Sequence, residues 1–260
     1  MGIELQKYST NSLPVSVLIS QILSKQIAIP GRIGLPDLQR PFVWKAKQVR
    51  DLMDSLYKGY PTGYIIIWQN PNIKLKDGSL SVGKKIIIDG QQRITALMTA
   101  IAGLPIVNSD YKKCRIKIAL NPFAALSDDK DAEIFAVQDS SHLKSKKWIP
   151  DIAEIFQTGF NMFGFVREYC TNNPDMRDSD LGEILSKLLN IGNRQIGIIE
   201  LSDTLEIDLV TDIFIRINSK GTSLSQGDFV MSKIAADEKF GGNQLRKAID
   251  YFSHLAIEPS

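Results

Sequence analysis

The sequence is poor in the residues that build disulfide frameworks and metal centres. Its 260 residues include only two cysteines and two histidines. Cys114 and Cys170 form no CxxC pair, which argues against a disulfide framework and against a thiolate metal site. His142 and His254 are isolated, which argues against zinc. We expect both cysteines to be buried thiols, because unpaired cysteine is most often buried.

Long hydrophobic runs and a strong net charge are missing as well. The longest apolar runs, at 64–68 and 86–88, are far shorter than a membrane span, and the first residues lack the pattern of a signal peptide. We therefore expect a cytoplasmic protein with no membrane partner. The formal net charge is +2, with 43% hydrophobic and 23% charged residues. This composition is typical of a globular protein and does not by itself demand nucleic acid.

The hydrophobic pattern predicts strands and helices together in the first half of the chain. Apolar residues at helical spacing predict helices, and short continuous apolar runs predict strands that are buried on both faces. The predicted helices are 13–29, one around 49–56 that ends at Gly59, and one that follows Arg93 and ends at Gly103; the predicted strands are 63–68, 84–88, 114–120 and 134–137.

After residue 148 the pattern becomes mainly helical. Helices are predicted at 151–157, 160–170, 181–191 and 207–217, with one strand at 195–201. The fold class is therefore α+β, a mixed sheet with helices followed by a mainly helical region. We divide it into residues 1–145, which the motif at 84–101 described below leads us to expect to bind nucleotide or phosphate, and residues 146–260, which are expected to complete the same module. The chain stops soon after a helical segment begins near 244, so we expect the front part of a longer protein.

The strongest chemical signal is the run KKIIIDGQQRITALMTAI at 84–101, where a buried strand, a tight turn and a helix follow one another. A helix N-terminus exposes backbone N–H groups and favours an anion. Gly90 removes the side chain where a ligand approaches the backbone. Gln91 and Gln92 bring amide donors, and Arg93 brings a planar cation that can grip two phosphate oxygens.

Asp89 cannot bind phosphate itself, but it could cap the helix, orient Arg93 or hold a Mg²⁺ ion that bridges phosphates. The alternative for the whole run is an ordinary Asp-Gly turn with solvated glutamines. It is not a Walker A loop, because GxxxxGK[ST] does not occur in the chain.

A second run, LPDLQRPFVW at 35–44, places Gln39 and Arg40 between prolines and before two aromatic residues. The arginine suits phosphate, and an aromatic ring can stack on a base. The alternative is that Phe42 and Trp44 are core anchors and that Arg40 pairs with a carboxylate.

A third run, DIFIRINSKGTSL at 212–224, places Asn218 where a predicted helix gives way to a loop. Asn218 either ends the helix together with Gly221 or contacts a nucleotide or water. The short basic run 144–147 is expected to be a solvated linker rather than a DNA-binding patch.

QRPFVW, GYIIIW, IDGQQRITAL and IFIRINSKGTSL occur here in that order. With them the chain resembles, over about residues 27–231, the N-terminal domain of the GmrSD-type modification-dependent restriction enzymes (domain-of-unknown-function family 262). The fold of that family looks like that of the ParB and sulfiredoxin group. The resemblance implies binding and hydrolysis of a nucleoside triphosphate (NTP) with Mg²⁺, used in anti-phage defence to control a partner that cleaves modified DNA.

The nuclease half of that family usually carries an HNH motif, which this chain cannot supply with its two isolated histidines. Cleavage is therefore expected of an HNH-type nuclease domain or subunit outside this chain. Two alternatives stay open: a DNA-binding module that recognises modified DNA without hydrolysis, and a ParB-fold phosphotransferase. The predicted site residues are Asp89, Gln91, Gln92 and Arg93 for catalysis, Gln39, Arg40, Gly90, Arg93, Thr95 and Asn218 for nucleotide or phosphate, and Lys45 and Lys47 for DNA.

Overall fold

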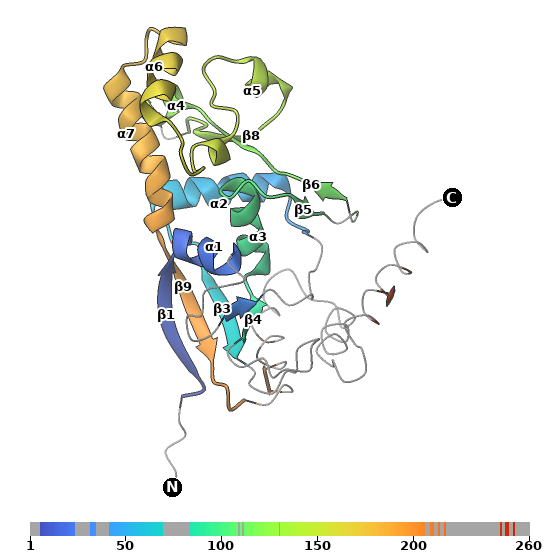
Figure 1. Cartoon of the computed structure of the whole chain (residues 1–260). Helices are drawn as coiled ribbons and strands as arrows, with labels where there is room; N and C mark the ends of the chain where they lie inside the picture. Colours follow the sequence, from blue (N-terminus) through green and yellow to red (C-terminus); the bar gives the residue numbers. More distant parts are fainter. Residues whose placement is uncertain are drawn as a thin grey trace.

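The structure is a computed structural model that describes residues 6–23, 32–34, 42–69, 84–108, 110, 112–129, 131–205, 209, 210, 213, 216, 245, 248, 249 and 252. The elements alternate between strands and helices at first and become mainly helical later (Figure 1). In chain order they are β1 (Tyr8–Pro14), α1 (Val15–Leu23), β2 (Arg32–Gly34), α2 (Ala46–Lys58), β3 (Tyr64–Gln69), β4 (Lys84–Asp89), α3 (Gln91–Ala100), β5 (Ile106–Val107), β6 (Lys113–Cys114), β7 (Ile118–Leu120), α4 (Pro122–Leu126), β8 (Phe135–Val137), α5 (Ser140–Lys144), the 3₁₀ turn η1 (Ile152–Glu154), α6 (Met162–Asn172), α7 (Asp178–Leu189), the 3₁₀ turn η2 (Asn190–Asn193) and β9 (Gln195–Leu201).

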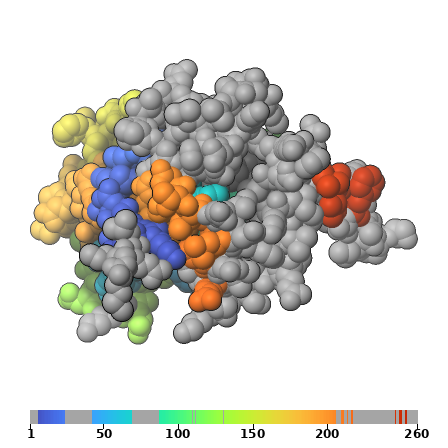
Figure 2. Space-filling view, turned by 90° about the horizontal axis from the view of Figure 1, so that it is seen from below, coloured from blue at the N-terminus to red at the C-terminus, as the bar shows by residue number. Residues whose placement is uncertain are grey.

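A mixed five-stranded sheet organises the molecule, in the order β1-β9-β3-β4-β2. β1 runs antiparallel to β9 and β3 antiparallel to β4, whereas β9 runs parallel to β3 and β2 parallel to β4. β9 therefore inserts a strand from the later part of the chain between two strands from the earlier part. Seen from below, β1 in blue lies beside the orange residues of β9 (Figure 2). The α+β class with a mixed sheet is confirmed.

Both faces of β3 are buried, as the continuous apolar run predicts. Ile65 and Ile67 belong to the large hydrophobic core, whereas Ile66 and Trp68 belong to a smaller cluster on the opposite face. That smaller cluster also contains Leu201, Leu205 and Val210, with Ile88, Ile199 and Ile213 packed against it. The described residues of the predicted helix 207–217, at 209, 210, 213 and 216, are helical, and two of them, Val210 and Ile213, pack in the cluster on the second face.

The large core joins the two halves of the chain. Its buried residues run from Val15 to Ile198 and come from α1, α2 and α3 as well as from α6, α7 and β9. The division at residue 145 stays a prediction, and the two parts share one core. Within the described residues, no helix has the length and apolar character needed to cross a membrane.

Several element predictions are confirmed. α2 ends at Lys58 with Gly59 as its C-cap, β9 has the predicted bounds, and β8 pairs with β7. The first helix begins later than predicted, because residues 13 and 14 form the end of β1. The predicted helix at 151–157 shrinks to the 3₁₀ turn η1. Residues 24–29 of the first predicted helix lie outside the described residues.

The predicted strand at 114–120 is wrong, because β6 and β7 are separate strands with residues 115–117 between them. Arg115 leaves the strand pattern to form an ion pair of 2.8 Å with the buried Asp151. The Ile116 N–H donates to Thr99 Oγ1 at 3.0 Å instead of to a neighbouring strand. Cys170 is buried as predicted, whereas Cys114 is only half-buried.

Candidate functional site

The turn between β4 and α3 brings a helix N-terminus against the centre of the sheet. β4 ends at Asp89 and α3 begins at Gln91, so the helix starts before Arg93 rather than after it. Gly90 has φ of +95°, and a Cβ there would lie 2.9 Å from Ile65 Cγ1 and 3.2 Å from Ile65 Cα. The close packing on β3 therefore requires glycine.

The first turn of α3 presents the backbone N–H groups that an anion-binding site needs. Helix geometry leaves the N–H groups of Gln91, Gln92 and Arg93 without partners inside the helix. Gly90, the N-cap residue, provides no side-chain cap. Aligned N–H groups of this kind favour a negatively charged ligand.

Arg93 is held beside this turn by contacts with the start of β3. Its Nη1 donates to the Tyr64 carbonyl at 2.6 Å, and its guanidinium lies against Gly63, which has φ of +86°. The nearest Asp89 oxygen is 4.0 Å away, and the Arg93 side chain is 27% exposed. A guanidinium has five N–H donors, so these contacts leave donors for an anion. Arg93 is neither enclosed nor tightly paired with a carboxylate.

The role of Tyr64 and Gly63 was missed from the sequence alone. The sequence places both at the start of a buried strand, and a carbonyl that accepts a hydrogen bond carries no signature in side-chain chemistry. Gly63 was the only available hint, since a glycine before an apolar strand often marks a close approach by another group.

Gln92 connects the turn to the LPDLQRPFVW run. Its Oε1 accepts hydrogen bonds from the backbone N–H groups of Val43 at 3.0 Å and Trp44 at 3.3 Å. The Phe42 N–H donates to the Val107 carbonyl at 2.8 Å, and the Phe42 ring is buried in the large core. Phe42 is therefore a core anchor, and the described end of the second motif lies against the first.

The remaining predicted residues fall into three groups. Asp89 is 30% exposed, and Gln91 and Thr95, one helical turn apart, are half-buried on α3. Lys45 and Lys47 are exposed at the start of α2, directly after the segment that Gln92 holds. Gln39, Arg40 and Asn218 lie outside the described residues.

The composition of the turn also bears on metal binding. Among the residues that the structure describes, no group of three or more His, Cys, Asp or Glu side chains could hold a metal ion. Mg²⁺ in nucleotide sites is commonly held by one or two carboxylates together with phosphate oxygens and water. A single partly exposed carboxylate, Asp89, fits that arrangement but would not bind Mg²⁺ without the nucleotide.

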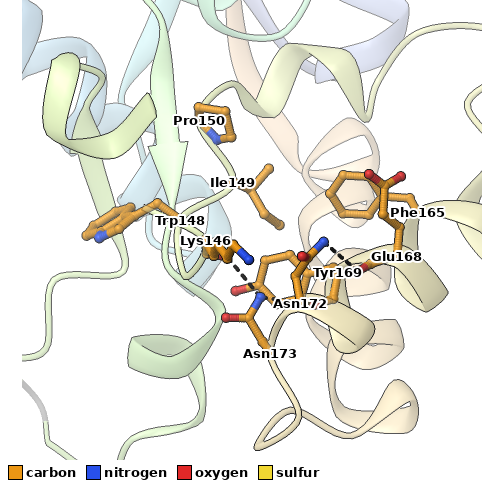
Figure 3. Close-up of a pocket in the computed structure, with 9 residues that line it drawn as sticks. All are labelled: Lys146, Trp148, Ile149, Pro150, Phe165, Glu168, Tyr169, Asn172 and Asn173. Atoms are coloured by element: carbon orange, nitrogen blue, oxygen red, sulfur yellow. Dashed lines mark hydrogen bonds between the residues drawn. The ribbon is translucent and has the colours of Figure 1, made fainter. Parts of the chain in front are cut away.

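A pocket of about 280 Å³ lies elsewhere, between residues 146–150 and α6 (Figure 3). Its buried polar groups are already bonded to the protein: Asn173 Nδ2 donates to the Lys146 and Tyr169 carbonyls, and Tyr169 Oη donates to the Lys147 carbonyl. In the run 144–147 the three lysines are exposed, as expected of a solvated segment, while the carbonyls of Lys146 and Lys147 are bonded to Asn173 and Tyr169. None of the predicted site residues lines this pocket.

Comparison with known proteins supports reading the motifs at 35–44, 84–101 and 212–224 as parts of one domain. Residues 19–235 match the family described as the GmrSD restriction endonuclease N-terminal domain. An uncharacterised protein of Methanocaldococcus jannaschii is 26% identical over 247 residues, which cover 79% of this chain and 40% of that protein. The chain thus spans less than half the length of that relative.

Proposed function

Because this chain belongs to the family of GmrSD restriction endonuclease N-terminal domains, we propose that it is the nucleotide-binding and NTP-hydrolysing regulatory domain of a modification-dependent restriction system. The family membership supports a role in restriction. The nucleotide, the modified DNA, the ParB-like fold and the HNH-type nuclease partner belong to the proposal. The phosphate site is the β4–α3 turn.

One observation carries the proposal: the backbone N–H groups at the N-terminus of α3 lie beside the partly exposed guanidinium of Arg93. Gly90 packs closely on Ile65 of β3, which fixes the start of α3 against the sheet, and the Tyr64 carbonyl holds Arg93 Nη1 at 2.6 Å. Fixed donors of this kind stabilise charge that develops on a transferred phosphoryl group, because they need no reorganisation during the reaction.

Each residue of the site would have a role that fits its chemistry. The α3 amides and Arg93 would bind the phosphate oxygens, and Asp89 would hold Mg²⁺, which neutralises phosphate charge when bound. Gln91, whose side chain has no hydrogen bond among the described residues, would orient water. Arg40 would neutralise charge on the transferred phosphoryl group from the second motif.

Hydrolysis of GTP, ATP, CTP and UTP with Mg²⁺, with and without DNA, tests the proposal. The Arg93→Ala variant should lose the activity. Arg194→Ala is a matched control, because Arg194 also donates to a backbone carbonyl, that of Leu56 at 3.2 Å, and also lies against a glycine of positive φ, Gly59. If the wild type turns over no nucleotide faster than a folded Arg93→Ala variant, hydrolysis at this turn is rejected. Transfer of labelled phosphate to an acceptor other than water would instead indicate a phosphotransferase.

Exposed Lys45 and Lys47 next to the turn favour a second candidate, a DNA-binding module without hydrolysis. Binding through phosphate contacts weakens steeply with salt, and each lost contact lowers the slope of log affinity against log salt by about one. The Lys45→Ala and Lys47→Ala variants should each show that loss. DNA binding that does not change with salt would reject this candidate.

A further inference from the structure

Gln92 takes part in two structures at once. As the second residue of α3, its backbone N–H belongs to the set that faces the proposed phosphate. Its side-chain oxygen holds Val43 and Trp44, which are 49 and 48 positions away in the sequence. A shift of the first turn of α3 therefore moves the acceptor on which the 42–44 segment is held.

The two hydrogen bonds fix the orientation of the Gln92 amide. Both donors are backbone N–H groups, which cannot accept a hydrogen bond, so the atom that faces them must be the oxygen. The amide nitrogen of Gln92 then points away from Val43 and Trp44. A flipped amide would place N–H groups against N–H groups and lose both bonds.

The segment that Gln92 holds is also attached on its other side. Phe42 is 4% exposed, and it is paired with β5 through the Phe42 N–H bond to the Val107 carbonyl. Consecutive N–H groups at 42, 43 and 44 are thus divided between β5 and α3. Among the described contacts of this segment, the one that belongs to the proposed phosphate site is made by Gln92.

We propose that Gln92 is a positioning residue that couples phosphate binding at the α3 N-terminus to the placement of the segment that follows Gln39 and Arg40. The inference rests on the proposed function and reassigns Gln92 from a catalytic role. A phosphate bound at the first turn of α3 holds Gln92 Oε1 in place, and through it the 42–44 segment. Hydrolysis then depends on Gln92 through Arg40, whereas phosphate binding depends on the main chain and Arg93.

Hydrogen exchange measured by mass spectrometry on the full chain tests the contact directly. Gln92→Met keeps the length of the side chain but removes the acceptor, so exchange at the amides of Val43 and Trp44 should rise about tenfold, the factor that corresponds to one typical hydrogen bond. Gln92→Glu keeps an acceptor and should retain the protection. Gln91→Met is the control in the same helical turn and should leave these amides unchanged.

Kinetics test the coupling. Gln92→Met should lower kcat by about tenfold with little change in KM, and adding Arg40→Ala should cost no more than Arg40→Ala alone. Mg²⁺ with a non-hydrolysable nucleotide analogue should slow exchange at 43 and 44 in the wild type but not in Gln92→Met.

The outcomes separate the two proposals. Unchanged exchange in a folded Gln92→Met variant overturns the inference whether or not nucleotide binds. Additive losses in the double variant, or a raised KM with kcat intact, also overturn it. Failure of the wild type to bind any nucleotide overturns the proposed function, and the coupling with it, even where exchange without nucleotide shows that the hydrogen bonds exist.

Discussion

The guanidinium of Arg93 occupies the space that a side chain on Gly63 would need. A Cβ at Gly63 would lie 3.2 Å from Arg93 Nη2 and 3.3 Å from Arg93 Cζ. The backbone of Gly63 therefore sets how closely Arg93 approaches the start of β3. It also sets the hydrogen bond that Arg93 makes with the next carbonyl, that of Tyr64.

Gly63→Ala should displace Arg93 and weaken nucleotide binding by about tenfold, since hydrogen bonds to charged groups contribute about that much or more. The variant should also lose roughly 1–2 kcal/mol of stability, because alanine tolerates positive φ poorly. Isothermal titration with a nucleotide analogue measures the first effect, and urea unfolding measures the second.

Gly159→Ala is the matched control for this change. Gly159 has the same φ of +86°, and a Cβ there meets nothing within 4 Å. Its substitution should cost similar backbone strain without changing affinity. If Gly63→Ala and Gly159→Ala bind the analogue equally well, the placement of Arg93 does not matter for binding.

The sequence predicted the helices and strands whose hydrophobic pattern depends only on residues close to one another in the chain. The apolar run of β3 follows from burial of both its faces and the helical spacing of α2 from burial of one face, so both elements can be read closely from the sequence. The strand at 114–120 failed because a long-range ion pair between Arg115 and Asp151 overrides the alternation. Nothing near Arg115 in the sequence announces that partner.

For the candidate site, too, the sequence indicated the local features but not the long-range contacts. The strand–turn–helix order pointed to the turn, which depends on neighbouring residues, but the packing of Gly90 on Ile65 could not be read from it. The contact of Gln92 with Val43 and Trp44, and that of Arg93 with Tyr64, join backbone atoms to distant side chains. Backbone atoms are identical in every residue, so sequence pattern alone could not find these contacts.

The carboxylate of Asp151 should be important for stability. It is 2% exposed, forms an ion pair with Arg115, lies 3.6 Å from Lys117 Nζ, and accepts the Ala153 N–H. Removing one partner of a buried pair leaves the other charge uncompensated. Because the arginine is partly exposed, Asp151→Ala should cost about 2–3 kcal/mol rather than the larger values of fully buried pairs. Urea unfolding measures the loss, and a loss below that of an exposed pair such as Lys58 with Asp54 would contradict the role.

Cys170 should react slowly with thiol reagents. Burial raises the pKa of its thiol to about 11, and a hydrogen bond with Asp178 adds to the shift. The thiolate is the reactive form, so at pH 8 only about one Cys170 in a thousand is reactive. Iodoacetamide labelling followed by peptide mass spectrometry should modify the more exposed Cys114 first. Asp178→Asn should lower the pKa and speed up labelling of Cys170, and unchanged labelling would contradict this account.

Gly90→Ala should be the most damaging of the glycine substitutions. Its Cβ would meet Ile65 Cα, which belongs to the backbone of a central strand and cannot move aside as a flexible side chain can. Strain at φ of +95° adds to the overlap, so the expected loss is roughly 2–4 kcal/mol. Urea unfolding of Gly90→Ala and Gly159→Ala separates the two effects, because Gly159→Ala suffers the backbone strain but not the steric overlap. Adding Ile65→Ala removes the Cγ1 atom that would lie 2.9 Å from the new Cβ, but the backbone of residue 65 stays in place at 3.2 Å. The double variant should therefore lose less stability than the sum of the two single losses, but the overlap with the backbone should remain. Equal stability of the two single glycine variants would show that the β4–α3 turn can move away from the sheet, and the main-chain donors of α3 would then not be held in place for an anion.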